Sequence, residues 1–150
     1  MHSSLPRIFF ARAIDGLDRS LSLSLATLVA TELGDVGLLL VDAVATEPDI
    51  DSSADEYSRA KSIVEHDLRT LRSCDAVLMD MTLPGRNYIG CSCELVYAHM
   101  WQKPCVVYMG RTDRNRPWLT YHATAVFETR GEAISYLTKL LKGRLTAIAT

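Results

Sequence analysis

Short, continuously apolar runs alternate along the chain with longer segments in which apolar residues recur every three or four positions. The runs predict buried strands, because a strand covered on both faces has no polar side to show. They occupy residues 7–11, 36–43, 75–81, 104–110 and 122–128. The helical repeats lie between and after them, at about 17–33, 55–72, 91–102 and 131–142. Strands that alternate with helices in this way predict a parallel sheet with helices on both faces.

This order of elements predicts a single α/β domain over residues 1–150. The expected fold is a flavodoxin-like (Rossmann-like) three-layer sandwich with a five-stranded parallel sheet. In such sheets, ligands bind beyond the carboxyl ends of the strands, where the strand order reverses. Site residues are therefore expected in the segments that follow the strands, at 11–16, 42–47, 80–90 and from 110 onward.

Composition excludes several classes of protein. The 150 residues carry a formal net charge of −2 and their basic residues are scattered, so no nucleic-acid partner is expected. The longest strongly apolar stretch, residues 36–41, is too short to cross a bilayer, so no membrane partner is expected. Residues 1–6 contain no apolar signal core, which favours a cytoplasmic protein. Four cysteines without a histidine pair at ligand spacing are interpreted as reduced packing residues, and no metal or other cofactor is expected.

Three carboxylates lie where they can meet at one edge of the sheet. Asp67 falls on the inner stripe of the predicted helix 55–72, Asp80 follows the third apolar run, and Glu94 lies in the first turn of the next helix. A carboxylate on an apolar stripe is costly unless it is paired or used. Asp67 has a simpler explanation as a boundary residue that reaches solvent, and Glu94 as a partner of the helix dipole. Together they suit acid–base and nucleophilic chemistry at a glycosidic carbon.

The stretch DAVLMDMTLPG at 75–85 is also similar to the phosphoacceptor strand of bacterial phosphoreceiver domains. Such a domain needs acids after its first strand to hold magnesium beside the phosphoryl group, and here Arg12 stands in that place. The fourth and fifth runs do not end in the Ser or Thr and the Lys of that family. Phosphorylation of Asp80 is therefore not expected. The sequence also lacks the GxxxxGK[ST] and GxGxxG phosphate-binding motifs.

Three ordered segments carry a family resemblance: FFARAIDG at 9–16, HDLRTLRSCDAVLMDMT at 66–82 and GCSCELVYAHMWQKPCVVY at 90–108. They resemble the nucleoside 2-deoxyribosyltransferases and their hydrolytic relatives, the nucleoside 5′-monophosphate N-glycosidases. The family pattern D-x-x-x-L-x-x-[AC]-D is matched by Asp67, Leu71 and Asp75. The pattern E-[LI]-x-x-A-x-x-x-x-K-P is matched by Glu94, Leu95, Ala98, Lys103 and Pro104.

The resemblance implies a catalytic domain that cleaves a base–sugar bond through a covalent glycosyl intermediate. Glu94 would be the nucleophile at C1′, Asp67 would contact the substrate and help to protonate the leaving base, and Asp80 would line the pocket. The transferases and deoxy-specific hydrolases usually have Tyr at the position of Phe9. In having Phe there, the chain resembles the CMP-type ribonucleotide hydrolases instead. We therefore expect hydrolysis of a nucleoside 5′-monophosphate, a ribonucleotide such as CMP. A 2-deoxyribosyltransferase and a non-catalytic nucleotide-binding module are the alternatives.

Further pocket residues are expected from the same resemblance and from their chemistry. Backbone N–H groups and guanidinium groups bind phosphate well. The candidate phosphate-binding residues are Arg12, Gly16, Arg19, Arg86 and Ser92. Arg19 is more simply explained as a solvated surface residue. Gly90 is expected to line the pocket. The candidates to frame the base are Ile14, Met81, Tyr88, His99 and Trp118, each of which is equally suited to the core or an interface. The resemblance also implies a homodimer in which Thr120 contributes a phosphate contact across the interface.

Overall fold

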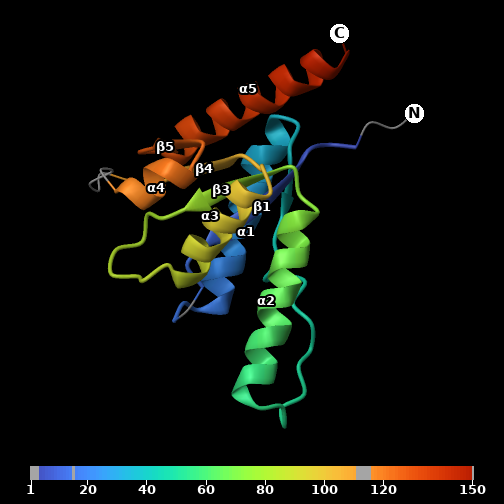
Figure 1. The fold of residues 1–150 in the computed structure, drawn as a ribbon, viewed down its shortest axis with the longest axis vertical. Coiled ribbons are helices and arrows are strands. Elements are labelled where there is room, and N and C mark those ends of the chain that lie inside the picture. Colours follow the sequence, from blue (N-terminus) through green and yellow to red (C-terminus); the bar gives the residue numbers. More distant parts are fainter. Residues whose placement is uncertain (1–3, 15, 111–115, 150) are drawn as a thin grey trace.

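A computed structural model describes residues 4–14, 16–110 and 116–149, with residues 145–149 described by their backbone (Figure 1). Within these residues, five parallel strands form one sheet in the order β2-β1-β3-β4-β5. The strands are β1 (Arg7–Arg12), β2 (Leu39–Val41), β3 (Ala76–Asp80), β4 (Cys105–Tyr108) and β5 (Ala125–Phe127). The helices are α1 (Arg19–Asp35), α2 (Glu56–Arg72), α3 (Ile89–Met100), α4 (Pro117–His122) and α5 (Arg130–Ala149). The predicted α/β fold, with its flavodoxin-like strand order, is confirmed.

Two apolar cores lie on the two faces of the sheet, because successive side chains of a strand point to opposite faces. In β1, Ile8 and Phe10 face one core, whereas Phe9 and Ala11 face the other. Helices α1 and α5 pack on the first core, and α2, α3 and α4 contribute to the second. The structure therefore has three layers, with the sheet in the middle.

Helix α2 is only partly covered by the rest of the molecule. Figure 1 shows its N-terminal half extending away from the sheet, beside the segment that leads into it. On its apolar stripe, Leu71 is buried, whereas Val64 is 52% exposed. The cover of this stripe by the rest of the molecule is therefore incomplete. This leaves Ile63 and Val64 beside a cleft that is described below.

The structure differs from the predicted elements mainly around the fifth strand. Residues 117–122 form helix α4, which was not predicted. Strand β5 is limited to Ala125–Phe127, within the predicted strand 122–128. Pro117 takes the first helical position, where its missing N–H group costs nothing. The second strand is also shorter than predicted, because the chain turns at residues 43–46.

The strand order places one crevice at the carboxyl edge of the sheet. Arg12 at the end of β1 lies opposite Asp80 at the end of β3 in the register of the two parallel strands. After β1 the chain continues into α1 on one face, and after β3 it continues into α3 on the other face. Because the two connections leave in opposite directions, a crevice opens beyond the ends of β1 and β3.

Candidate active site

A cleft of about 540 Å³ lies at this crevice. Its lining comes from the end of β1, the segment after β2, helix α2, and the loop that leads into α3. The lining residues are Arg12, Ala13, Ile14, Glu47, Ile63, Val64, Asp67, the segment 85–91 and Glu94. The two carboxyl groups with the strongest predicted roles, Asp67 and Glu94, therefore meet in one cleft although they come from different helices.

Glu94 lies in the second turn of α3 and not in the first, because the helix begins at Ile89, two residues earlier than predicted. Its Oε1 atom is 3.8 Å from the place that a Cβ atom on Gly90 would occupy, so the carboxyl group lies beside that glycine. Burial raises the pKa of Glu94 to about 8; the charge of Asp67 raises it further, and Arg12 opposes the shift. In the ligand-free protein Glu94 is therefore mostly protonated at neutral pH.

Asp67 projects from α2 into the same cleft. Its Oδ1 atom is inaccessible to solvent, and among the described residues it has no hydrogen-bond partner. Burial raises the pKa of Asp67 to about 6, and the nearby charges of Glu47 and Asp42 raise it as well, whereas His66 lowers it. A buried carboxyl oxygen without a partner is costly, so this atom is suited to hold a proton or to bind a ligand.

Asp67 and Glu94 form an interacting pair, since the charge of one raises the pKa of the other. Such a pair loses its two protons in two steps, which belong to the pair as a whole. With pKa values of about 6 and about 8, the pair holds one proton across the neutral range. One carboxylate and one carboxylic acid are what a nucleophile and a general acid require.

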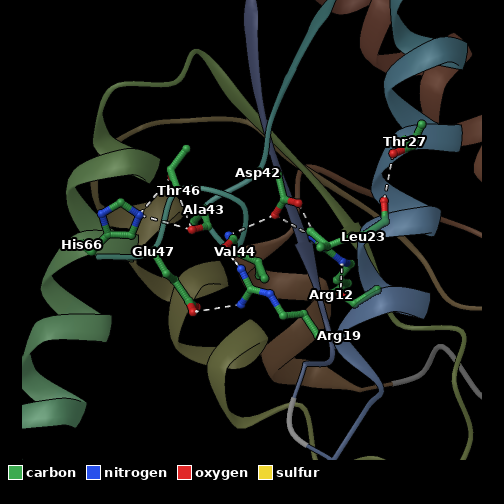
Figure 2. Close-up of polar contacts among 11 residues, drawn as sticks. Arg12, Arg19, Leu23, Thr27, Asp42, Ala43, Val44, Thr46, Glu47 and His66 are labelled. Atoms are coloured by element: carbon green, nitrogen blue, oxygen red, sulfur yellow. Dashed lines mark hydrogen bonds and ion pairs between the residues drawn. The ribbon is translucent and has the colours of Figure 1, made fainter. Parts of the chain in front are cut away.

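Arg12, at the end of β1, lines the cleft, and Figure 2 shows its side chain directed toward Asp42. Its guanidinium group donates to both carboxylate oxygens of Asp42, with N–O distances of 2.9 and 3.1 Å, and its Nε atom donates to Ser22 Oγ at 2.9 Å. Both members of this ion pair are buried. Arg12 is thus held by the protein itself, and it presents a fixed positive charge near Glu94.

Asp80 lies on the other side of the sheet from Asp67 and Glu94. Its Oδ2 atom accepts a hydrogen bond from the hydroxyl group of Tyr108 at 3.0 Å, and its Oδ1 atom accepts from the backbone N–H and the hydroxyl group of Thr82. Asp80 is two residues after Leu78, which faces the core under α1 and α5, so it points to the same face. The structure therefore places this predicted pocket acid outside the cleft, in the packing of the sheet edge.

The remaining candidates divide into three groups. Four predicted pocket residues line the cleft: Ile14, Arg86, Tyr88 and Gly90. Gly16 lies against Arg86. Phe9 is 2% exposed and belongs to the core beneath α2 and α3. The candidates that do not line the cleft are Ser92, Thr120, Arg19, Met81, His99 and Trp118.

Sequence reasoning missed Glu47 as a site residue. It lies in the segment 42–47 after β2, which the strand order already marked as a place for ligand contacts. The signal was therefore present, but a glutamate in an acidic loop looks like an ordinary solvent-exposed residue.

Among the described residues, no group of three or more His, Cys, Asp or Glu side chains is placed to hold a metal ion. No described helix has the length and apolar character to cross a membrane.

Several solved structures are similar to this chain. A 2-deoxyribosyltransferase from Bacillus psychrosaccharolyticus superposes with a TM-score of 0.67 at 15% identity, covering 85% of this chain and 90% of its own. A conserved protein from Enterococcus faecalis V583 gives 0.64 at 14% identity, covering 93% and 99%. The CMP N-glycosidase BcmB from Clostridium botulinum gives 0.52 at 14% identity, covering 87% and 97%. No family model and no curated protein matches the sequence.

At these identities the similarity establishes the fold. It is the fold that the sequence resemblance implied, shared with a 2-deoxyribosyltransferase and a CMP N-glycosidase. The fold and the cleft together therefore define an α/β sandwich with two partly buried carboxyl groups in a cleft at the carboxyl edge of its sheet.

Proposed function

We propose that the protein is an N-glycosidase that hydrolyses the base–sugar bond of a nucleoside 5′-monophosphate, a ribonucleotide such as CMP. The observation that carries the proposal is the meeting of Asp67 and Glu94, two partly buried carboxyl groups from different helices, in one cleft. The raised pKa values of both groups, about 6 and about 8, support it. The similarity in fold to a 2-deoxyribosyltransferase and a CMP N-glycosidase supports it.

In the first step, the Glu94 carboxylate attacks C1′ of the sugar and forms a glycosyl ester. The bond between C1′ and the base nitrogen breaks with its electrons going to the base, and the base receives the proton of Asp67. An anion close to C1′ stabilises the positive charge that develops on the sugar in the transition state.

In the second step, water attacks C1′ and the ionised Asp67 accepts a proton from this water. The ester bond to Glu94 breaks, and the sugar phosphate leaves with the configuration at C1′ retained. The reactive form has Glu94 ionised and Asp67 protonated, which is the minor arrangement in the ligand-free protein, given their pKa values. Moving one proton within the pair produces it.

The 5′-phosphate is proposed to bind at the end of the cleft near Arg86. The position of a Cβ atom on Gly16 would be 2.9 Å from Arg86 Nη1, so this guanidinium group lies against the turn after β1. Guanidinium groups and backbone N–H groups are the usual ligands of phosphate. Arg12 lines the same cleft, and Asp42 and Ser22 hold its guanidinium group in place.

The test is a product assay with CMP, dCMP and deoxynucleosides, each with and without a free acceptor base. Free base with sugar phosphate is the expected product. A new nucleoside that appears only with an acceptor would identify a transferase. Ligand-induced thermal stabilisation without any product would identify a binding module.

Glu94→Gln tests the nucleophile. It is expected to lower the rate of base release at least a thousandfold, on the order seen when a covalent catalyst is removed. Rapid quenching with acid and mass spectrometry should detect a glycosyl adduct on Glu94 in the natural sequence. Glu65→Gln is the matched control, because Glu65 is exposed on α2 and pairs with Lys61. Full activity of Glu94→Gln would refute the mechanism.

A further inference from the structure

The segment 42–47 is held against the rest of the molecule from several sides (Figure 2). Asp42 accepts two hydrogen bonds from Arg12 and one from the N–H group of Val44. His66 Nε2 lies 3.2 Å from the Ala43 carbonyl oxygen and 3.1 Å from Thr46 Oγ1. The segment is therefore fixed to β1 and to α2 at the turn of helix that carries Asp67.

Glu47 ends this segment and lines the cleft together with Asp67. Its Oε2 atom is 3.8 Å from Arg19 Nη1, and Arg19 Nη2 donates to the Val44 carbonyl oxygen at 3.3 Å. The Arg19 side chain is 61% exposed and that of Glu47 is 24% exposed. Water therefore screens the charge of Arg19 more than that of Glu47, and this pair at 3.8 Å neutralises Glu47 only in part.

The charged groups around Asp67 come from several parts of the chain. Glu47 and Asp42 approach from the segment after β2, Glu94 from α3, and His66 precedes Asp67 on α2. Arg12 on β1 binds Asp42, and Arg19 on α1 binds Glu47. Arg86, from the loop before α3, lines the same cleft. The charge of Asp42 is matched by the two-pronged contact with Arg12, and Glu94 is mostly protonated. Glu47 is thus the anion near Asp67 whose charge is least compensated.

We propose that Glu47 is a positioning residue that acts through Asp67, because its negative charge favours the arrangement in which Asp67, and not Glu94, carries the proton that the leaving base must receive. The proposal rests on the proposed function for the role of Asp67 as the general acid. It assigns Glu47 an electrostatic role and no contact with the reacting atoms. The fixed segment 42–47 serves to hold that charge at a constant distance from Asp67.

The physical basis is the cost of placing two carboxylates near each other in a partly buried cleft. A like charge nearby favours the neutral form of a carboxyl group. Burial is the larger cause of the raised pKa of Asp67, and the charge of Glu47 is the next. The Glu47 carboxylate is not among the groups that fix the segment, because its anchoring hydrogen bonds are made by Asp42, by His66 and by Arg19 with the Val44 carbonyl oxygen.

Two substitutions with opposite expected effects test the proposal. Glu47→Gln removes the anion, so the titration of the Asp67 carboxyl carbon, followed by NMR in the ligand-free protein, should move down by roughly one pH unit. Arg19→Gln removes the cation that partly compensates Glu47, so the same titration should move up. The double variant should behave like Glu47→Gln alone, and Glu65→Gln should leave the titration in place.

The same variants have a predicted signature in turnover. The acid limb of the kcat/KM profile, which belongs mainly to Asp67, should shift to lower pH in Glu47→Gln and to higher pH in Arg19→Gln. In Glu47→Gln, the maximum of kcat/KM should fall roughly tenfold for each unit by which the pKa of Asp67 is lowered, because fewer molecules then carry the proton on Asp67. Thermal unfolding of each variant checks that the fold is kept.

If both substitutions shift the titration in the same direction, or neither shifts it, the proposal is overturned, since a merely structural role would loosen the segment in both. If the titrations move as expected but the natural sequence releases no base at any pH, the assignment of Glu47 stands and the proposed function fails.

Discussion

At the residue scale, Glu94 makes the ligand-free protein less stable than it would be with a neutral side chain. Its pKa lies above the ordinary value of 4.5, chiefly because of burial. A raised carboxyl pKa in the folded state contributes stability that is fully present below pH 4.5 and is lost as the pH rises through about 8. Glu94 thus carries a cost in folding stability that grows toward alkaline pH.

This cost can be measured by comparing the natural sequence with Glu94→Gln. We expect the variant to gain in free energy of unfolding, relative to the natural sequence, by on the order of a few kcal/mol between pH 5 and pH 9. Urea denaturation at a series of pH values gives the difference, and Glu65→Gln should run parallel to the natural sequence. A difference that stays constant over this range would contradict the burial of Glu94.

Asp80 offers a second residue-scale prediction, because the structure assigns it to packing. Asp80→Ala leaves the buried hydroxyl group of Tyr108 and the N–H group of Thr82 without this acceptor. We expect a loss of about 2–4 kcal/mol in the free energy of unfolding. Asp80→Asn keeps polar partners for both groups and should cost less than half as much. If Asp80→Ala unfolds like the natural sequence but loses base release, Asp80 belongs to the chemistry after all.

At the scale of elements, the turn after β1 and the loop before α3 meet at Gly16 and Arg86. Gly16 has a φ of +75°, and an added Cβ atom would lie 2.9 Å from Arg86 Nη1. Gly16→Ala therefore strains the turn and displaces the guanidinium group. We expect a several-fold increase in KM for a nucleoside 5′-monophosphate and a small change in kcat, because Arg86 is proposed to bind the phosphate.

Gly37→Ala separates the strain of the backbone from the displacement of the Arg86 guanidinium group. Gly37 has a φ of +81°, but a Cβ atom there would meet no atom within 4 Å. Both substitutions should cost roughly 1–2 kcal/mol of stability, since a left-handed conformation is strained for alanine. Only Gly16→Ala should raise KM in a steady-state assay. An equal KM in both variants would show that Arg86 does not bind the phosphate.

The elements were more predictable than the orientation of their side chains. Apolar runs and helical repeats predict the sheet, because burial on both faces leaves a clear signature in sequence. The same signature hides which face a strand residue points to, so the side of the sheet on which Asp80 lies could not be predicted. Helix α4 was missed because its six residues are too few for a helical repeat. Asp67 and Glu94 were chosen because their spacing matches the pattern of the family that the sequence resembles, whereas Glu47 has no such marker.

At the scale of the whole molecule, we propose a homodimer, as the sequence resemblance implies. Helices α3 and α4 carry large side chains that remain exposed: Met100 is 67%, Trp118 78% and Tyr121 70% exposed. Trp118 stacks on His122 with an angle of 6° between the rings, so this exposed surface is ordered by its own contacts. Ordered aromatic side chains are typical of the centre of protein interfaces. Thr120 lies on the same short helix, where a partner chain could use it.

Sedimentation equilibrium should therefore give about twice the chain mass of 16.7 kDa. Trp118→Glu should produce monomers with an unchanged circular dichroism spectrum, because it places a charge in an apolar interface while leaving the core intact. Tyr57→Glu is the matched control, since Tyr57 is 77% exposed on the projecting end of α2. If Thr120 completes the phosphate site of the partner, Trp118→Glu should also raise KM for the monophosphate, and Tyr57→Glu should not. A natural sequence that is monomeric at micromolar concentration would show that each cleft is complete within one chain. A Trp118→Glu variant that remains dimeric would show that α4 is not the interface.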